Sequence, residues 1–180
     1  MVNMVKVNKK KSVCCALCMM PLLIAADQVT KLLTLHYLSG GRDVVLIPGV
    51  LRLTYVENRG AAFGILQGKT VLFLLLTVVI LLFLARCYLK LLPERRYRLL
   101  RILCTAVGAG AVGNLIDRMR LGFVVDMIYF ELIHFPVFNV ADCYITVSAF
   151  VLVAAILFYY KDDDFSCLSF SRKRKDSHEA

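Results

Sequence analysis

The chain has 180 residues, of which 59% are hydrophobic and only 19% are charged. A soluble domain is about 45–50% apolar and roughly 25% charged, so this composition excludes an ordinary water-soluble fold. Four prolines and ten glycines also exclude a collagen-like or disordered chain. The class that remains is a compact integral membrane protein, which we expect to form a single domain.

The net charge of +9 is distributed unevenly along the sequence. Basic residues gather before the first apolar stretch, between the second and the third, and after the last. These clusters are Lys6, Lys9, Lys10 and Lys11; Arg86, Lys90, Arg95, Arg96, Arg98 and Arg101; and Lys161, Arg172, Lys173, Arg174 and Lys175. By the positive-inside rule, both termini and the middle loop lie in the cytoplasm. The charge therefore indicates orientation in a membrane, and we expect no nucleic-acid partner.

Four uncharged apolar stretches cover residues 12–26, 70–85, 102–116 and 143–160. The shortest would span roughly 22 Å as a helix, against a hydrocarbon core of about 30 Å, so the spans must extend into flanking polar residues. We expect these spans at about 13–36, 70–90, 99–117 and 142–161. The predicted fold class is mainly α, a four-helix polytopic membrane protein.

The first stretch follows Lys9, Lys10 and Lys11, an arrangement that also occurs in secretory signal peptides. Cleavage after Ala26 would place Ile24 where such peptides carry a small residue. The helical pattern also continues beyond this point into a leucine-rich segment. We therefore interpret the first stretch as a retained transmembrane helix.

Residues 39–69 connect the first two spans on the extracytoplasmic side. Within them, residues 44–47 and 50–56 have the composition of two short strands around a Pro48–Gly49 turn. Apolar and polar side chains alternate in the second of these segments, as expected for a half-buried strand. We predict a small extracytoplasmic β-structure between the first and second helices.

Other segments carry weaker signals. The second extracytoplasmic segment, at about 118–142, has a mixed pattern, and residues 162–180 are interpreted as a disordered cytoplasmic tail. The seven cysteines lie within or beside apolar stretches, apart from Cys167 in the tail, and the three histidines are scattered. We interpret the cysteines as small membrane hydrophobes and expect no metal and no cofactor.

The segment from Gly108 to Gly113 matches the Gly-x-Gly-x-x-Gly pattern of dinucleotide-binding proteins. That pattern has its meaning in a strand–turn–helix unit, whereas here it lies inside a predicted membrane helix. Small residues in a membrane helix allow a neighbouring helix to approach closely. We therefore predict that these glycines serve helix packing.

Four aspartates and three asparagines lie at the extracytoplasmic ends of the predicted helices or in the segments between them. A charged residue costs about 2.5–3.5 kcal/mol at the centre of a membrane helix, so such residues need a reason. They are Asp27, Asp117, Asp126, Asp142, Asn58, Asn114 and Asn139. The predicted topology brings all of them to one side of the bilayer, and this convergence is the main functional signal in the sequence.

Two of the aspartates have a basic residue nearby in the sequence. Asp27 and Lys31 are four positions apart on one helix face, where they can form an ion pair. Asp117 is followed by Arg118, which we expect to neutralise it or to hold a neighbouring loop. For these two aspartates a structural role is favoured over a catalytic one.

Asp126 and Asp142 have no basic residue within five positions of either. Two carboxylates about 3 Å apart cannot both ionise, so such a pair holds one proton. The ionised member can draw a proton from a water that attacks a peptide carbonyl, which the protonated member polarises. This chemistry favours an aspartyl hydrolase. The alternative is a small proton-coupled membrane transporter that uses the same carboxylates.

Five motifs in this order resemble those of the bacterial lipoprotein signal peptidase family (signal peptidase II). They are Asp27-Gln-Val-Thr-Lys31, Asn58-Arg-Gly-Ala-Ala-Phe63-Gly64, Gly113-Asn114-Leu-Ile-Asp117-Arg118, Val124-Val125-Asp126 and Phe138-Asn139-Val-Ala-Asp142. The resemblance covers about residues 13–161. It implies an aspartic endopeptidase of the bacterial cytoplasmic (inner) membrane. Such an enzyme removes the signal peptide from diacylglyceryl-modified prolipoproteins, just before the lipid-modified cysteine.

The resemblance also implies roles for individual residues. Asp126 and Asp142 match the catalytic aspartates of the family. The matching substrate-binding or supporting residues are Asp27, Lys31, Asn58, Arg59, Gly60, Asn114, Asp117, Arg118, Asn139 and Ala141. We expect an active site near the extracytoplasmic face, a β-cradle after the first span and inhibition by globomycin. The expected partners are prolipoprotein substrates and membrane lipid, and the expected oligomeric state is a monomer.

The two aspartates have different surroundings in the sequence. Asp142 begins the fourth predicted helix, where the helix dipole favours a negative charge. Asp126 lies among valine, methionine and isoleucine and has no such helix end. We therefore predict that Asp142 more often carries the charge and Asp126 the proton of a coupled pair.

Overall fold

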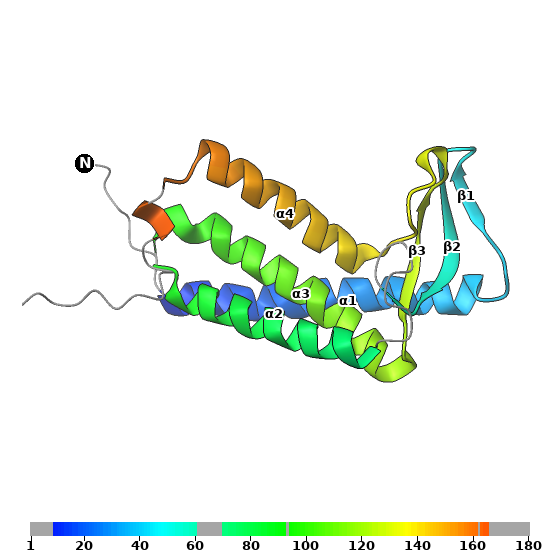
Figure 1. Ribbon diagram of the computed structural model, residues 1–180, viewed down its shortest axis with the longest axis horizontal. Coiled ribbons are helices and arrows are strands. Elements are labelled where there is room, and N and C mark those ends of the chain that lie inside the picture. Colours follow the sequence, from blue (N-terminus) through cyan, green and yellow to red (C-terminus); the bar gives the residue numbers. More distant parts are fainter. Residues whose placement is uncertain (1–8, 61–69, 93, 162, 166–180) are drawn as a thin grey trace, which may run out of the picture.

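The computed structural model describes residues 9–60, 70–92, 94–161 and 163–165. It contains four helices that are long and apolar enough to cross a membrane (Figure 1). They are α1 (Lys9–Leu38), α2 (Thr70–Lys90), α3 (Arg98–Leu121) and α4 (Val140–Phe158). The short 3-10 helices η2 (Arg95–Tyr97) and η3 (Glu131–Ile133) lie between them. The predicted fold class is confirmed. Residues 61–64 of the second motif, and all but residues 163–165 of the predicted tail, lie outside the described residues.

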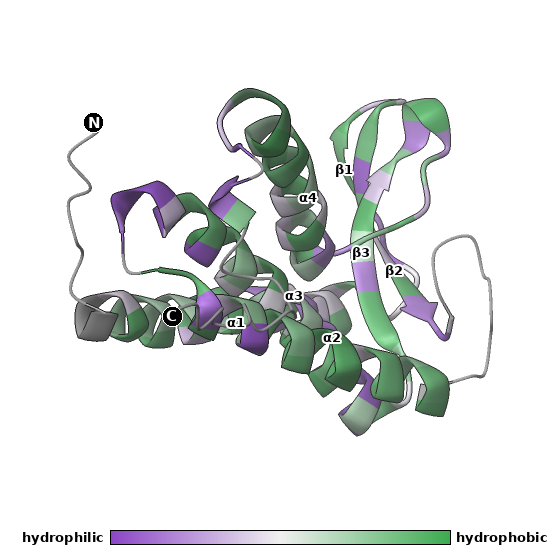
Figure 2. Ribbon diagram, turned by 60° about the vertical axis from the view of Figure 1, so that its left-hand side comes forward, coloured by the Kyte–Doolittle hydropathy of each residue, from purple (hydrophilic) through white to green (hydrophobic). Residues whose placement is uncertain are grey.

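The outward faces of the helices are apolar. Leu75 of α2 is 61% exposed, and Phe150 and Phe158 of α4 are 73% and 88% exposed. Figure 2 shows hydrophobic residues over most of α2 and α4. A helix that is hydrophobic all round belongs in a core or in lipid, and these helices form no larger core among the described residues. The bundle therefore has the surface of a membrane protein.

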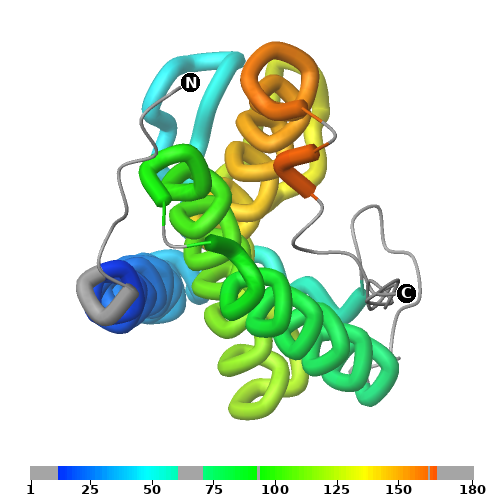
Figure 3. The backbone as a smooth tube through the Cα atoms, turned by 90° about the vertical axis from the view of Figure 1, so that its left-hand side faces the viewer, coloured from blue at the N-terminus to red at the C-terminus, as the bar shows by residue number. Residues whose placement is uncertain are grey.

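The helix α3 lies in the middle of the bundle and packs against α1, α2 and α4 (Figure 3). Its glycines make this close packing possible. A Cβ atom on Gly110 would lie 2.6 Å from the carbonyl oxygen of Ala141, and one on Gly113 would lie 2.5 Å from Oδ2 of Asp27. Both distances are shorter than any van der Waals contact. The structure therefore supports the packing interpretation of this glycine-rich segment.

A three-stranded antiparallel sheet lies at one end of the bundle, with its strands running across the helix axes (Figure 1). Its strands, in spatial order, are β1 (Val44–Ile47), β2 (Leu51–Asn58) and β3 (Val124–Phe130). The first two strands match the predicted β-structure. The third comes from the segment between α3 and α4, for which no strand was predicted. Residues 124–127 of β3 are all buried, so they lack the alternation that reveals a half-exposed strand.

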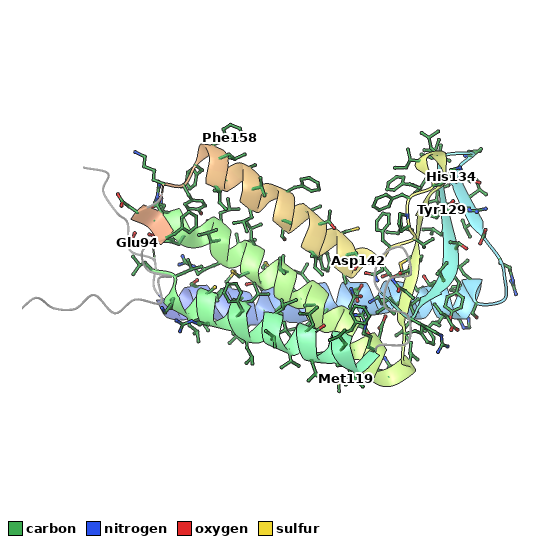
Figure 4. All side chains as sticks on the ribbon, in the orientation of Figure 1. Glu94, Met119, Tyr129, His134, Asp142 and Phe158 are labelled. Carbon is green, nitrogen blue, oxygen red and sulfur yellow. The ribbon has the colours of Figure 1, made fainter. Side chains whose placement is uncertain are left out.

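The other end of the bundle is closed by a small core and an ion pair. The core consists of Leu91, Tyr97, Leu100, Ala155 and Tyr160. Beside it, the guanidinium of Arg96 pairs with both carboxylate oxygens of Asp164 and lies 5.1 Å from the ring centroid of Tyr159. Glu94 and Phe158 mark this end in Figure 4, far from the sheet. These contacts join the α2–α3 connection to the segment after α4.

Candidate active site

A cavity of about 860 Å³ lies between the sheet, the end of α3 and the start of α4. Asp126 of β3 and Asp142 of α4 both line it. Figure 4 shows Asp142 where α4 begins, beside the sheet. Asn58, Asn114 and Arg118 contribute to the same wall. The structure thus brings polar residues from four separate segments of the sequence to one cavity.

Asp126 is held by two asparagine side chains. Asn139 donates a hydrogen bond of 2.7 Å to its Oδ1, and Asn58 donates one of 2.9 Å to its Oδ2. The residue is only 1% exposed, and β3 and its neighbours surround it. Burial, and then the negative charge of Asp142, raise the pKa of Asp126 from 3.8 to about 7. Its carboxyl group can therefore carry a proton near neutral pH.

Asp142 is held by the start of its own helix. Asn139 is the N-cap of α4, and its Oδ1 accepts a hydrogen bond of 2.9 Å from the backbone N–H of Asp142. In return, the backbone N–H of Asn139 donates to Oδ2 of Asp142 at 3.2 Å, which completes a capping box. Nδ2 of Asn114 donates to the other carboxylate oxygen at 2.9 Å. The position of Asp142 is thus fixed on both of its oxygens.

A buried ammonium group lies behind these side chains. Nζ of Lys31 is 3.0 Å from Oδ2 of Asp27, 3.0 Å from Oδ2 of Asp117, and donates a hydrogen bond of 2.8 Å to Oδ1 of Asn114. Lys31 is only 1% exposed, so all three of its N–H donors find partners away from water. The ion pair predicted between Asp27 and Lys31 is present, and Asp117 joins it.

Of the two roles expected for Arg118, an ion pair with Asp117 is not found among the described residues, whereas its bond to Gly60 fits the other, holding a neighbouring loop. Consecutive residues of a helix point in different directions, and Asp117 turns toward Lys31 while Arg118 lines the cavity. The Arg118 guanidinium lies 4.9 Å from the ring centroid of Phe73 and donates a long hydrogen bond of 3.4 Å to the carbonyl oxygen of Gly60. A cation therefore faces the same cavity as the two aspartates.

The remaining predicted residues lie around this centre at different depths. The backbone N–H of Ala141 donates to Oδ1 of Asp27 at 2.9 Å, and that of Gly60 donates to Oδ1 of Asn58 at 3.0 Å. Both support the residues that hold the aspartates. Arg59 lies at the exposed rim, paired with Glu57 at 2.8 Å, and has no contact with either aspartate among the described residues.

Comparison with known proteins identifies the family. The model of the signal peptidase (SPase) II family matches residues 19–158. The chain belongs to this family. It is 38% identical over 148 residues to the lipoprotein signal peptidase of Streptococcus pyogenes serotype M5 (strain Manfredo), covering 80% of this chain and 91% of the relative. The corresponding protein of serotype M3 (strain ATCC BAA-595 / MGAS315) is 37% identical with the same coverage.

Solved structures agree with this assignment. One bacterial membrane enzyme determined by the in meso method matches with a TM-score of 0.68 and 29% identity, over 95% of this chain and 99% of the other. A second matches with a TM-score of 0.66 and 30% identity, over 86% of this chain and 97% of the other. This signal peptidase II family member is therefore a membrane-embedded peptidase, and the family predicted from its motifs is confirmed.

Sequence reasoning missed the apolar wall of the cavity in this signal peptidase II family member. Phe130 and Phe138 stack with their ring centroids 5.7 Å apart, and Phe135 meets Phe138 edge to face at 5.7 Å. Ile145 and Val147 of α4 line the cavity as well. Apart from Phe138, which begins the fifth motif, these residues lie outside the motifs, and only the folded chain brings them together. The cavity is thus lined by apolar side chains as well as by the polar ones.

Gln28 was also missed, although it lies inside the first motif. Its Nε2 donates to Oδ2 of Asp27 at 3.2 Å, to the carbonyl oxygen of Gly113 at 3.2 Å and to Oδ1 of Asp117 at 3.0 Å. Asp27 and Asp117 are both buried and share the single ammonium of Lys31. The Gln28 amide gives each of them a further hydrogen-bond donor. Its position directly after Asp27 was the available signal.

The acidic and sulfur-containing side chains have no metal-binding arrangement within the described part of the chain. No group of three or more His, Cys, Asp or Glu residues there is placed to hold an ion. Cys15 and Cys18 have Cys-x-x-Cys spacing but lie exposed on α1. The two aspartates of the cavity are instead held by amide donors.

Proposed function

We propose that this protein is an aspartic endopeptidase that cleaves the signal peptide from diacylglyceryl-modified prolipoproteins, just before the lipid-modified cysteine. The observation that carries this proposal is the shared cavity, in which amide donors hold Asp126 and Asp142 beside an apolar wall. Relatives that are named lipoprotein signal peptidase support the substrate class.

The first step is the addition of water to the scissile carbonyl. Ionised Asp142 accepts a proton from a water molecule, whose oxygen attacks the carbonyl carbon. Asp126 donates its proton to the carbonyl oxygen, so the tetrahedral intermediate is a neutral diol. The raised pKa of Asp126, about 7, supports its role as the acid of this step.

The second step breaks the peptide bond. Asp142 returns its proton to the nitrogen of the leaving amine, and one hydroxyl of the diol gives its proton to Asp126 as the C–N bond breaks. The products are the carboxyl end of the signal peptide and a free amino group on the lipid-modified cysteine. Asp142 is again ionised and Asp126 again protonated, so the pair is ready for another turnover.

The surroundings of the cavity suit a lipid-bearing peptide. A diacylglyceryl group holds the scissile bond close to the membrane, and the cavity lies at one end of a bundle whose outer faces are apolar. The wall that contains Phe135 and Phe138 offers apolar contacts to the lipid-modified residue or its neighbours. We place both termini in the cytoplasm and the cavity on the extracytoplasmic side, and we expect a monomer that globomycin inhibits.

The test is cleavage of a diacylglyceryl-modified prolipoprotein peptide by the purified protein in detergent or lipid. The wild type, Asp126→Asn and Asp142→Asn run side by side, with an unlipidated peptide as the substrate control. Asp43→Asn is the matched variant, because Asp43 pairs with Arg52 of the sheet and neither residue lines the cavity. Folding of every variant is checked by its Tm.

We expect the wild type and Asp43→Asn to cleave the lipidated peptide and not the unlipidated one. In both cavity variants kcat/KM for the lipidated peptide should fall by at least about 1,000-fold. Cleavage that survives either cavity substitution would overturn the assignment of the pair. A folded wild type that cleaves neither peptide would overturn the proposed activity, and proton-coupled flux in vesicles would then favour a transporter.

A further inference from the structure

Three asparagines present their Nδ2 groups to the two cavity aspartates, and each has its own carbonyl oxygen fixed by another donor. Backbone N–H groups fix two of them: Gly60 donates to Asn58, and Asp142 donates to Asn139. Asn114 differs. Its Oδ1 accepts two hydrogen bonds, and the shorter, at 2.8 Å, comes from the ammonium of Lys31. A buried cation thus determines which way the Asn114 amide points.

We propose that Lys31 is a positioning residue that, through the Asn114 amide, keeps Asp142 as the ionised member of the pair and leaves the proton on Asp126. This inference rests on the proposed peptidase function. The path consists of two hydrogen bonds, from Nζ of Lys31 to Oδ1 of Asn114 and from Nδ2 of Asn114 to Oδ1 of Asp142.

The direction of both hydrogen bonds is fixed by the groups that make them. Because the ammonium can only donate, Oδ1 of Asn114 must face Lys31 and Nδ2 must face Asp142. An amide N–H is the right partner for an ionised carboxylate. If the amide rotated, its oxygen would face Oδ1 of Asp142, and only a protonated Asp142 could bind it. The orientation of Asn114 therefore favours the ionised form of Asp142. The amides of Asn58 and Asn139 also donate to Asp126, but backbone N–H groups orient them, so the bond polarised by a buried cation is what distinguishes Asp142.

Lys31 does not need its bond to Asn114 in order to have its charge neutralised. Asp27 and Asp117 already supply two carboxylates to one ammonium, each at 3.0 Å. A second donor, Nδ2 of Asn139, also reaches Oδ1 of Asn114, but at 3.2 Å and without a charge. The bond from Lys31 is shorter and charge-assisted, so it is the stronger of the two.

Other charged groups around the pair do not provide this selection. They are Asp27 of α1, Asp117 and Arg118 of α3, Glu57 of β2 and Arg59 just after it, and the titratable thiol of Cys143 beside Asp142 on α4. Arg118 also faces the cavity, but its contacts among the described residues are with Gly60 and Phe73 rather than with either carboxylate. Among the charged groups of the described residues, Lys31 is the one that donates to the amide of Asn114, which in turn donates to Asp142.

The test measures the pH dependence of kcat/KM for wild type, Lys31→Met and Asn114→Leu. Asn114→Leu removes the donor to Asp142 and leaves the Asp27–Lys31–Asp117 ion pairs in place, so it remains informative if Lys31→Met fails to fold. Thr34→Val is the control, because Thr34 is buried one turn along α1 from Lys31 and its hydroxyl donates to the helix carbonyl of Thr30. The same samples, labelled with isotopic aspartate, give infrared spectra of the protonated carboxyl.

We expect the acidic limb of the pH profile to move up by about 1 pH unit in both variants, and not in the control. At pH values well below the midpoint of that limb, a shift of this size lowers kcat/KM about tenfold. The protonated carboxyl band, assigned with Asp126→Asn and Asp142→Asn, should shift from Asp126 toward Asp142 in Lys31→Met or Asn114→Leu.

An unchanged profile and band in folded Lys31→Met or Asn114→Leu would overturn the inference while leaving the proposed peptidase in place. A wild type whose proton already resides on Asp142 would also overturn it. Absence of cleavage by the folded wild type is a different outcome, since it removes the proposed function itself.

Discussion

The carboxylate of Asp117 accepts a hydrogen bond of 3.1 Å from the backbone N–H of Val125, the residue directly before Asp126. The same Oδ2 atom contacts Nζ of Lys31 at 3.0 Å. One oxygen therefore ties the last turns of α3 both to α1 and to the strand that carries an aspartate of the cavity. The helix bundle and the sheet are joined at the point where the chemistry is proposed to occur.

Substitutions at Asp117 are expected to act through the position of β3. In Asp117→Asn the remaining carbonyl oxygen can still accept from Val125, whereas Asp117→Ala leaves that buried N–H without a partner. A hydrogen bond to a charged group contributes about 1.5–3 kcal/mol, so the alanine variant should lose more stability and more kcat than the asparagine variant. Cleavage kinetics and thermal unfolding in one detergent measure both effects.

Arg120→Gln is the control for these variants, because Arg120 is exposed on the same helix. Equal losses in Asp117→Ala and Asp117→Asn would contradict the positioning role of the Val125 bond. They would instead indicate that only the charge of Asp117 matters, through Lys31.

The local parts of the site were predictable from the sequence, and the distant contacts were not. Asp27 and Lys31 are one helical turn apart, so their ion pair follows from helix geometry alone. The bond from Lys31 to Asn114 joins residues 83 positions apart and exists only because α1 packs against α3. Sequence proximity suggested Arg118 as a partner of Asp117. In the folded protein, the packing of α1 against α3 places Lys31 beside Asp117 instead.

The sheet shows the same limit. Alternating side chains predicted β2, whose residues are partly exposed, whereas β3 is buried over its first four residues and has no such alternation. The convergence of Asp126 and Asp142 was nevertheless foreseen, since membrane topology alone places both on one side of the bilayer. Helix topology was thus the stronger guide to the site than strand patterns.

Two glycines of α3 should respond differently to alanine. In Gly113→Ala the new Cβ would lie 2.5 Å from Oδ2 of Asp27, so α1 or the Asp27 side chain must move, at a cost of about 1–3 kcal/mol. In Gly108→Ala the nearest atom is the flexible end of Met20 at 3.6 Å, and the helix gains about 0.5–1 kcal/mol from the better helix former. Thermal unfolding should therefore rank Gly108→Ala above wild type and Gly113→Ala below it. A Gly113→Ala variant as stable and active as wild type would show that the α1–α3 contact tolerates expansion.

Arg96, at the end of the bundle opposite the cavity, should affect stability without affecting catalysis. Its guanidinium binds both oxygens of Asp164 and lies over the ring of Tyr159. Lysine cannot make the two parallel bonds, so Arg96→Lys should lose part of the stabilisation and Arg96→Ala all of it. Because solvent screens this partly exposed pair, we expect a small fall in Tm, with kcat/KM unchanged. A fall in kcat/KM of folded Arg96→Ala would reveal coupling between the two ends of the bundle.

The stability of the protein should depend on pH through Asp126. Its pKa in the folded protein is raised to about 7, so the folded state holds this proton more tightly than the unfolded chain, where the carboxyl titrates near 3.8. The resulting stabilisation is complete below a pH of about 4 and is lost as the pH rises through about 7. The Tm of the wild type should therefore fall more between about pH 5 and about pH 8 than the Tm of Asp126→Asn, which has no proton to lose. Parallel Tm changes in the two proteins would mean that Asp126 is already ionised at the lower pH, which would also remove it as the acid of the proposed reaction.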